Sequence, residues 1–319
     1  MEVIRYNPAQ QQVIDLLGRA ATAAPVDFPR DVAEQCYAAL HAGLSDLGPH
    51  FASVSEPTFV SKHDLATIHG CEAQATAPAE PFSWSLPTAR GTVVHKALEL
   101  SVHWRGEAPP GVLVTEAVAR LATSDRGPAA WLGALTDGEL AELTGAATDL
   151  VAKFLEGFPP LKREWWPVTE TKLNVQLFDG ALVLSGACDL LLGRPDPSTP
   201  RRVVIDFKTG MPANAHREDA RFYALLETLR NGVPPRLVAS CYLDVAQVDR
   251  DRLQAETVTP ALLEAAVARV VDGIRKRIEI STGDRIAARL PSGTCRWCPL
   301  QATCAEGQAH LAALSARWA

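Results

Sequence analysis

Two short apolar segments each contain charged side chains that are costly to bury. The segment VVIDFKTG at 203–210 carries Asp206 and Lys208 two residues apart, and the segment LSGACDLLLG at 184–193 carries Asp189. Side chains alternate between the two faces of a strand, so Asp206 and Lys208 are predicted to share one face, opposite their apolar neighbours. A buried carboxylate and a buried ammonium need a partner, a metal ion or a substrate. These segments therefore predict a functional site.

Asp189 and Asp206 converge on one point if their two strands pair across the loop RPDPSTP. Two carboxylates and a backbone carbonyl form a hard oxygen site that suits Mg²⁺ or Mn²⁺. Lys208 adds an electrophile for developing negative charge, or a group that orients a water molecule. These are the parts of a metal-assisted phosphodiester hydrolase. The alternative from spacing alone is a structural ion pair between Asp206 and Lys208, with Asp189 beginning a turn.

Three cysteines near the C-terminus supply a second set of metal-ligating side chains. The segment SGTCRWCPLQATCAEG places Cys295, Cys298 and Cys304 in a C-x₂-C-x₅-C array, and Cys71 lies far upstream. Structural Zn²⁺ sites and cubane iron-sulfur clusters both commonly use four cysteines, so both remain open. Disulfides are not expected in a cytoplasmic chain with seven cysteines. The other three cysteines stand in apolar segments and are expected to behave as small hydrophobic residues: Cys36, Cys188 and Cys241.

The elements that must position these residues form a helical first half and a strand-rich second half. The spacing of apolar residues predicts five helices before residue 160, over 8–21, 31–44, 61–75, 89–104 and 137–158. Three strand-like segments then predict a meander, over 165–178, 181–193 and 201–210. A helix over 218–232, a strand over 236–246 and a helix over 261–281 follow. The predicted fold class is α/β or α+β, with a central mixed sheet behind a helical N-terminal half.

Composition limits the classes of protein to which the chain can belong. The 319 residues are 47% hydrophobic and 21% charged, which is typical of a soluble globular protein. The N-terminus lacks a signal-peptide pattern and no apolar run approaches ~20 residues, so the prediction is a cytoplasmic protein without a membrane partner. The net charge of -6 gives no global basic field for nucleic acid. Local basic candidates are Arg201 with Arg202, Arg217 with Arg221, and the run 275–277.

The order of the charged motifs resembles the PD-(D/E)XK nuclease superfamily, and specifically its RecB-like branch. SGACDLLLG and VVIDFKTG resemble the G-x-x-D and D-x-K elements of the branch, and ARGTVVHKALEL supplies Gly91 and His95 for its upstream G-x-x-x-H. The resemblance implies a restriction-endonuclease-like core that cleaves DNA with Mg²⁺ or Mn²⁺. The implied metal ligands are His95, Asp189, Asp206 and the backbone carbonyl of Phe207, with Lys208 serving the hydrolytic step.

Three further residues are candidates for supporting roles. Members of the branch usually carry a Gln and, four residues on, a Tyr on the helix after the D-x-K strand. Here REDARFYALL supplies Tyr223, whereas Asp219 occupies the position of the Gln. Tyr223 is alternatively a core aromatic. Glu170 in VTETKL adds a carboxylate if its strand lies beside the site, and is otherwise a surface residue.

The cysteines extend the resemblance to the iron-sulfur members of the branch, which include AddB-type nucleases and RecB-like CRISPR-associated nucleases. Those members have one cysteine before the His helix and three after the nuclease core, as this chain does. The resemblance spans about residues 55–310 and implies that Cys71, Cys295, Cys298 and Cys304 hold a [4Fe-4S] cluster. Structural Zn²⁺ remains the alternative.

The predicted function is that of a metal-dependent DNA nuclease, a single-strand-specific exonuclease in DNA repair, recombination or defence. The chain lacks a Walker-type G-x-x-x-x-G-K-[ST] sequence, so a separate helicase is the expected unwinding partner. Arg217 and Arg221, one helical turn apart, are candidates for contact with the DNA backbone, or are solvent-exposed. The alternatives are a catalytically silent DNA-binding or scaffold subunit and a zinc-stabilised interaction module. The predicted domains are a helical extension of unknown role, 1–52, and a nuclease domain, 53–319, with its catalytic core at about 88–250.

Overall fold

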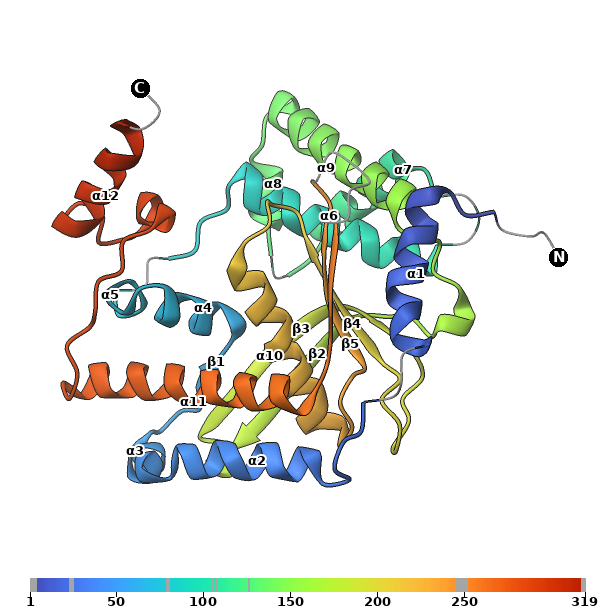
Figure 1. Ribbon diagram of the computed structural model, residues 1–319. Helices are drawn as coiled ribbons and strands as arrows, with labels where there is room; N and C mark the ends of the chain where they lie inside the picture. The colour runs from blue at the N-terminus through green and yellow to red at the C-terminus, as the bar shows by residue number, and fades with distance from the viewer. Residues whose placement is uncertain are drawn as a thin grey trace.

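A mixed sheet runs through the centre of this computed structural model, and helices cover both of its faces (Figure 1). The structure describes residues 5–22, 26–78, 81–104, 106, 108–125, 127–244 and 252–316. Within these residues the sheet consists of β1 (Thr58–Val60), β2 (Val168–Leu177), β3 (Leu182–Leu192), β4 (Val203–Lys208), β5 (Leu237–Tyr242) and β6 (Leu253–Thr257).

The strand order places the two charged segments side by side. The sheet runs β1-β3-β4-β5-β6, and β2 pairs with β3. β3 is antiparallel to β2 and to β4, which confirms the predicted meander. β4 is parallel to β5, and α10 (Asn214–Asn231) connects them, because parallel neighbours need a long crossover. The arrangement confirms the predicted α/β class with a central mixed sheet.

Helices occupy most of the first half of the chain, as predicted. They are α1 (Pro8–Thr22), α2 (Val32–Gly43), α3 (Gly48–Ser53), α4 (Lys62–Gly70), α5 (Glu72–Ala75), α6 (Leu86–His103), α7 (Pro110–Ala122), α8 (Ala129–Gly133) and α9 (Asp137–Gly157). The later helices besides α10 are α11 (Pro260–Thr282) and α12 (Ala305–Ala316). Short 3₁₀ helices are η1 (Ser45–Leu47), η2 (Arg163–Trp165), η3 (Phe178–Gly180) and η4 (Gly293–Trp297). The strand predicted over 236–246 is β5, and 245–246 lie outside the described residues.

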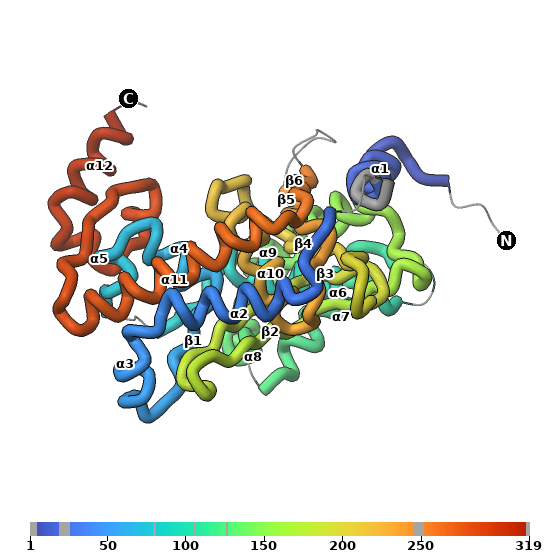
Figure 2. The backbone as a smooth tube through the Cα atoms, turned by 60° about the horizontal axis from the view of Figure 1, so that its bottom comes forward, coloured from blue at the N-terminus to red at the C-terminus, as the bar shows by residue number. Residues whose placement is uncertain are grey.

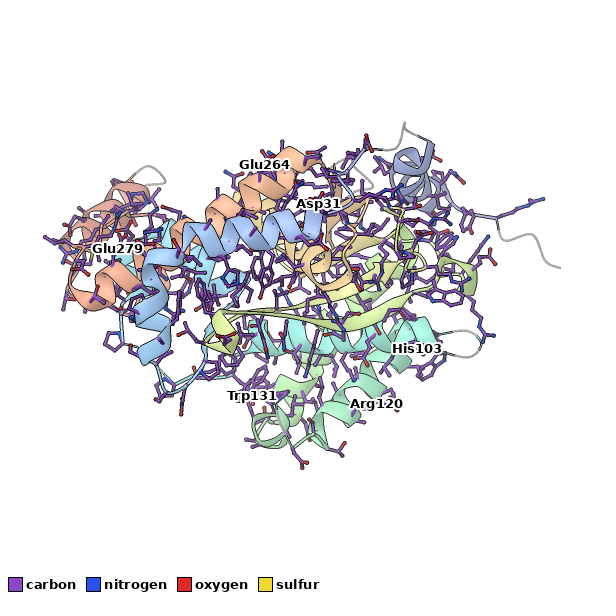
Figure 3. The ribbon with its side chains drawn as sticks, turned by 90° about the horizontal axis from the view of Figure 1, so that it is seen from below. Asp31, His103, Arg120, Trp131, Glu264 and Glu279 are labelled. Carbon is purple, nitrogen blue, oxygen red and sulfur yellow. The ribbon has the colours of Figure 1, made fainter. Side chains whose placement is uncertain are left out.

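Two apolar cores, one on each face of the sheet, fix the positions of the helices. Val204 of β4 packs with residues of α2, α4, α10 and α11 on one face. Ile205 and Phe207 of the same strand pack with α1, α6, α7 and α9 on the other. Figure 3 shows Glu264 of α11 on one side of the sheet and Trp131 of α8 on the other. The two cores confirm the alternation of faces predicted for β4.

Capped N-termini define where two helices near the charged segments begin. Ser61 accepts a hydrogen bond from the backbone N–H of Asp64, whose carboxylate accepts one from the N–H of Ser61, so a capping box starts α4. Ser85 and Thr88 form an equivalent box at the start of α6. These local interactions fix the start of each helix, and therefore the direction of the side chains that it presents to the sheet.

The N-terminal and C-terminal segments lie at opposite ends of the molecule (Figures 1 and 2). Near one end, α1 packs beside α9, and at the other, α12 and the segment before it stand beside α5. Residues before position 53 share the main cores, because Leu40 and Phe51 are buried in the same cluster as Tyr223. None of the helices in the described part of the chain has the length and apolarity needed to span a bilayer.

Candidate active site

Asp206 is a buried carboxylate on β4, with 2% of its surface exposed. The Nζ atom of Lys208 lies 2.7 Å from Asp206 Oδ2 and donates to Asp219 Oδ2 at 2.9 Å. Within the described residues, Oδ2 of Asp206 has the ion pair with Lys208 as its contact and accepts no hydrogen bond from any other group. Buried polar atoms are almost always satisfied, so this oxygen is suited to an additional ligand.

Asp189 on β3 connects the sheet to α6. Its Oδ1 atom lies 3.0 Å from Nδ1 of His95, and its Oδ2 atom accepts a hydrogen bond of 2.5 Å from the backbone N–H of Phe207. The two contacts fix both oxygens of Asp189. The structure therefore brings together His95, Asp189, Asp206 and Lys208, which lie on three different elements. Whether the carbonyl of Phe207 binds a metal stays a prediction.

The pairing of β2 with β3 is interrupted where Glu170 faces Asp189. Glu170 has a φ of 49°, in the left-handed region that is unfavourable for residues other than glycine. The alternation of faces also shifts there, because Cys188 and Leu190 pack in cores on opposite faces of the sheet. Such local strain persists where the surroundings impose it and is frequent at functional sites. Here it directs the carboxylate of Glu170 toward Asp189.

The residues at this interruption have the chemistry of a divalent metal site. His95, Glu170 and Asp189 each place one ligand atom within 4.8 Å of the other two. An imidazole and two carboxylates suit Mn²⁺ or Mg²⁺, and Oδ2 of Asp206 adds a further oxygen on the next strand. The donor set therefore fits a divalent cation.

Charges in the site shift the pKa values of its members. Burial and the nearby charge of Asp189 raise the pKa of Glu170 to about 6. Burial alone would lower the pKa of His95, but the charge and hydrogen bond of Asp189 raise it instead. Burial would also raise the pKa of Asp206, but the charges of Lys62 and Lys208 lower it. Asp206 is therefore held ionised, as a metal ligand must be.

Lys62 completes the site, and the sequence did not point to it. Its Nζ atom donates to Asp206 Oδ1 at 2.9 Å and lies 4.8 Å from the centre of the Tyr223 ring. Lys62 is the first residue of α4 and precedes Asp206 by 144 positions. The segment SKHDLATIHGC has no pattern that distinguishes this lysine from a surface residue. The only related feature was Cys71, a candidate ligand at the end of the same helix.

The two supporting candidates on α10 lie in the site. Asp219, at the position of the expected Gln, pairs with Lys208. Tyr223 is buried, and its hydroxyl donates to the carbonyl of Ala187 at 2.6 Å. The ring covers Gly186, where a Cβ atom would come within 2.8 Å of it. The glycine of the G-x-x-D element is therefore required by the close approach of Tyr223.

Arg217 and Arg221, the candidates for DNA contact, are both engaged by Glu256 on β6. Arg217 donates to it at 3.1 and 2.7 Å, and Arg221 at 3.0 and 2.7 Å. Burial would raise the pKa of Glu256, but these hydrogen bonds lower it to about 2. Both arginines are therefore paired with a carboxylate of the protein itself, and their contact with DNA stays a prediction.

The four candidate cluster ligands line one cavity of about 20 Å³, although one of them lies more than two hundred residues before the others. Backbone amides donate to three of the sulfur atoms at 3.4 to 3.5 Å. The amides belong to Leu290, Ser292 and Gly307, and the sulfur atoms to Cys71, Cys295 and Cys304, respectively. The four-sulfur donor set fits Zn²⁺ or an iron-sulfur cluster.

Glu72 holds Cys71 beside the C-terminal segment. Arg285 donates to the Glu72 carboxylate at 3.1 and 2.7 Å, and the N–H of Ala288 donates to it at 2.9 Å. The N–H of Ala73 in turn donates to the carbonyl of Ala288. The protein itself therefore brings the distant cysteine to the C-x₂-C-x₅-C array.

The other three cysteines are buried in the apolar cores. Burial, assisted by the charge of Glu264, raises the pKa of Cys36 to about 11. Burial likewise raises the pKa of Cys188 and of Cys241 to about 12. They are neutral thiols that fill core space.

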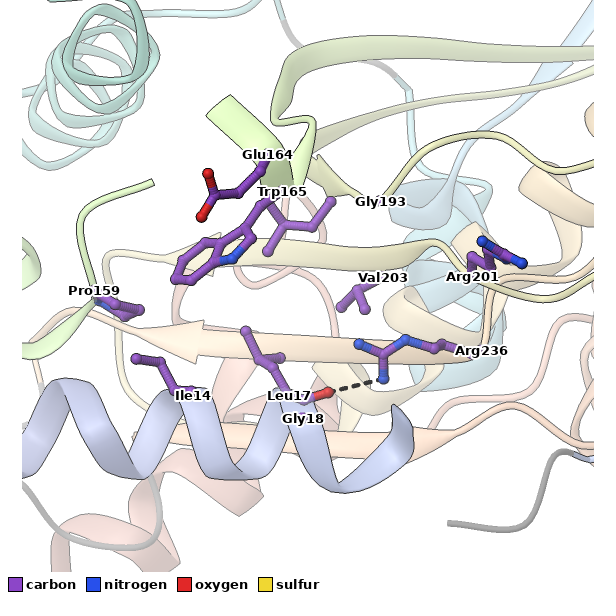
Figure 4. A pocket seen from close by; sticks show the side chains of 11 residues that line it. Ile14, Leu17, Gly18, Pro159, Glu164, Trp165, Gly193, Arg201, Val203 and Arg236 are labelled. Carbon is purple, nitrogen blue, oxygen red and sulfur yellow. Dashed lines mark hydrogen bonds between the residues drawn. The ribbon is translucent and has the colours of Figure 1, made fainter. Parts of the chain in front are cut away.

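A separate cavity of about 320 Å³ lies between α1 and the sheet (Figure 4). Ile14, Leu17 and Trp165 contribute apolar surface, and Arg236 donates to the carbonyl of Leu17 at 2.8 Å. Its lining includes none of the predicted site residues. The cavity is therefore distinct from the candidate metal site.

Comparisons with known proteins identify the family. A family model described as the PD-(D/E)XK nuclease superfamily matches residues 62–305. A solved structure described as "Putative exonuclease" from Eubacterium rectale is 11% identical, with a TM-score of 0.43, and the match covers 75% of this chain and 87% of the other. The structure of SSO0001 is 13% identical, with a TM-score of 0.33, and the match covers 84% and 95% of the two chains. No curated protein matches the chain.

Proposed function

The chain belongs to the PD-(D/E)XK nuclease superfamily, and from that premise we propose that it is a metal-dependent deoxyribonuclease of the RecB-like branch. Membership implies a phosphodiester hydrolase with DNA as its substrate. The observation that carries the finer proposal is the convergence of His95, Asp189, Asp206 and Lys208 where β3, β4 and α6 meet. These residues come from the three motifs that resemble the branch, in the same order.

In this proposal, Mg²⁺ or Mn²⁺ would be held by His95, Glu170 and Asp189. Asp206 and the carbonyl of Phe207 would provide further oxygens. When bound, a divalent cation supplies Lewis-acid activation of a phosphodiester and of a water molecule. The chain's own contribution is a set of ligands fixed before the substrate arrives, because both oxygens of Asp189 already have partners.

Lys208 supplies positive charge for the hydrolytic step. Asp206 and Asp219 hold its ammonium from two sides, at 2.7 and 2.9 Å, so its position is determined before DNA binds. A fixed cation next to the scissile phosphate stabilises the negative charge that develops on the phosphate oxygens. Tyr223 supports the site indirectly, by packing on Gly186 and bonding to the strand that carries Asp189.

We further propose that the four cysteines hold a [4Fe-4S] cluster, with structural Zn²⁺ as the alternative. The shared cavity and the amide-to-sulfur hydrogen bonds support a four-thiolate site of either kind. The resemblance to iron-sulfur nucleases of the branch favours the cluster. An absorption spectrum with iron, sulfide and zinc analysis of anaerobically purified protein distinguishes the two.

The proposed substrate is single-stranded DNA degraded from an end in the cytoplasm, in repair, recombination or defence, with a separate helicase to unwind duplexes. The proposed domains are 1–52 and 53–319, with the catalytic core at about 88–250. Circular and linear single strands of equal length test the need for an end. If circles are cut as fast as linear strands, the enzyme is an endonuclease.

Cleavage of labelled single-stranded DNA with Mn²⁺, by the wild type and by Asp206→Ala, tests the main proposal. Cleavage by the wild type alone supports the nuclease. DNA binding without cleavage by the wild type supports the alternative of a catalytically silent subunit. If the protein neither binds nor cleaves DNA and contains zinc, the interaction module is the correct function.

A further inference from the structure

Asp206 is contacted by two lysines, one on each oxygen of its carboxylate. Lys208 lies 2.7 Å from Oδ2, and Lys62 donates to Oδ1 at 2.9 Å. Lys208 also pairs with Asp219, so its charge is shared between two carboxylates. The second lysine therefore brings an additional positive charge to a group that the proposed function assigns to a divalent cation.

The fold determines the position of Lys62 closely. Its helix starts at the Ser61–Asp64 capping box, immediately before it. Leu65, on the same helix, packs against α11 at Gly273, where a Cβ atom would lie 2.8 Å from Leu65 Cδ2. The ammonium of Lys62 lies over the Tyr223 ring, with Nζ 4.8 Å from its centre. The contact with Asp206 is thus built into the junction of α4, α10 and α11.

Lys62 in this position would weaken the binding of a divalent cation to Asp206. An ammonium and a divalent cation that approach the same carboxylate repel each other, and the repulsion is large where water is excluded. The Lys62 side chain is 30% exposed and that of Asp206 3% exposed, so water screens the lysine only on its outer side.

We propose that Lys62 is a positioning residue that holds Oδ1 of Asp206 and, through its charge, weakens the binding of a divalent cation to the same carboxylate. The inference rests on the proposed function, because it requires Asp206 to be a metal ligand. In the metal-free protein, the ammonium of Lys62 neutralises the buried carboxylate and holds its Oδ1 atom in place. Its charge opposes a cation at the other oxygen of the same carboxylate, so the lysine raises the metal concentration at which the site fills.

The test is the affinity of the metal-free protein for Mn²⁺, measured by calorimetry in the absence of DNA. We expect Lys62→Met to bind Mn²⁺ about tenfold more tightly than the wild type, which is the low end of the effect of one nearby charge on proton binding. Lys62→Arg retains the charge and is expected to bind within about twofold of the wild type. If Lys62 only supports the fold, Lys62→Met is expected to bind Mn²⁺ as tightly as the wild type or more weakly.

Lys276→Met is the matched control, because it removes one positive charge from α11, where Lys276 pairs with Asp272 at 2.6 Å outside the site. It should leave the affinity unchanged. Thermal unfolding of all variants shows whether they are folded. Unchanged or weaker Mn²⁺ binding by folded Lys62→Met overturns the inference and leaves the nuclease proposal intact. A wild type that binds no Mn²⁺, or binds it equally well as Asp206→Ala, overturns both.

Discussion

The backbone N–H of Phe207 donates a 2.5 Å hydrogen bond to the carboxylate of Asp189. This bond runs from β4 to a side chain of β3 and lies next to Asp206, the residue before Phe207. The bond thereby holds the carboxylates of Asp189 and Asp206, which lie on separate strands, at the end of the paired region of β3 and β4. The relationship depends on backbone geometry, so substitutions of the neighbouring side chains test the chemistry without removing the support.

Asp206→Ala and Lys208→Ala are expected to reduce metal-dependent cleavage of single-stranded DNA by at least about 100-fold, because each removes a fixed charge from the reacting centre. The measurement is the single-turnover rate with Mn²⁺, accompanied by circular dichroism. Asp149→Ala is the control, since Asp149 is an exposed carboxylate on α9. Full activity in either site variant would contradict the assignment.

Glu170→Ala and Glu170→Gly remove the same carboxylate but differ in their tolerance of a φ of 49°. Both are expected to weaken Mn²⁺ binding. Glycine adopts the left-handed region without penalty, so Glu170→Gly should be more stable than Glu170→Ala by about 1 kcal/mol. Urea unfolding measures the difference. Equal stability of the two variants would show that the strand is not strained at this position.

Cys71→Ser and Cys298→Ser are expected to have the same effect, because both residues line one cavity. Each should lose most of the bound iron, or zinc if that is the native metal, and unfold at a lower temperature. Cys36→Ala, in the core, should keep the metal. A Cys71→Ser protein with full metal content would remove Cys71 from the site.

The hydrogen bonds from Arg217 and Arg221 to Glu256 predict that the stability of the protein depends on pH in the acid range. The pKa of Glu256 is about 2 in the folded protein and about 4.3 when unfolded. Its contribution is therefore complete above about pH 4.3 and is lost as the pH falls toward 2. Glu256→Gln should be less stable than the wild type at pH 7, and the difference should shrink toward pH 2. A constant difference would show that ionisation is not involved.

Arg217→Gln combined with Arg221→Gln should weaken DNA binding and reduce its dependence on salt concentration, because fewer counterions are released. Binding to labelled single strands over a range of salt concentrations measures the slope. Arg120→Ala removes a cation that pairs with Glu116 on α7 and is the control (Figure 3). An unchanged slope in the double variant would leave Glu256 as the principal partner of both arginines.

Periodicity predicted most of the fold. The apolar spacing of α1, α2, α6 and α9 and the alternation in β2 to β4 gave the correct elements, because each packs one face against a core. β1 and β6 were missed because strands of 3 and 5 residues carry little periodicity. α7 was missed because it starts with Pro110 and Gly111, which are typical of a turn. α12 was missed because its apolar residues form no stripe, and Gly307 is the residue that it buries.

The sequence pointed to the site residues that stand in its motifs, and it missed what depends on packing and backbone conformation alone. Asp206 and Lys208 share a face because of simple alternation, and their 2.7 Å contact confirms it. The interruption of the β2–β3 pairing at Glu170 was not predictable, because a positive φ at a glutamate leaves no signal in the sequence. Lys62 was not predictable because its role arises from the packing of α4 on α10, far from Asp206 in sequence. Nonlocal contacts of this kind require the three-dimensional structure.

The hydrogen bonds from Arg285 and Ala288 to the Glu72 carboxylate join the two parts of the chain that carry the four cysteines, and no sulfur atom takes part in them. In a site whose ligands meet only on the metal, delivery must occur while the chain is still open. Here hydrogen bonds already close a loop of more than two hundred residues. Metal binding therefore does not have to supply the free energy that offsets the conformational entropy lost when the loop closes. In the proposed four-cysteine site, a metal would therefore bind to ligands that contacts within the protein already hold together.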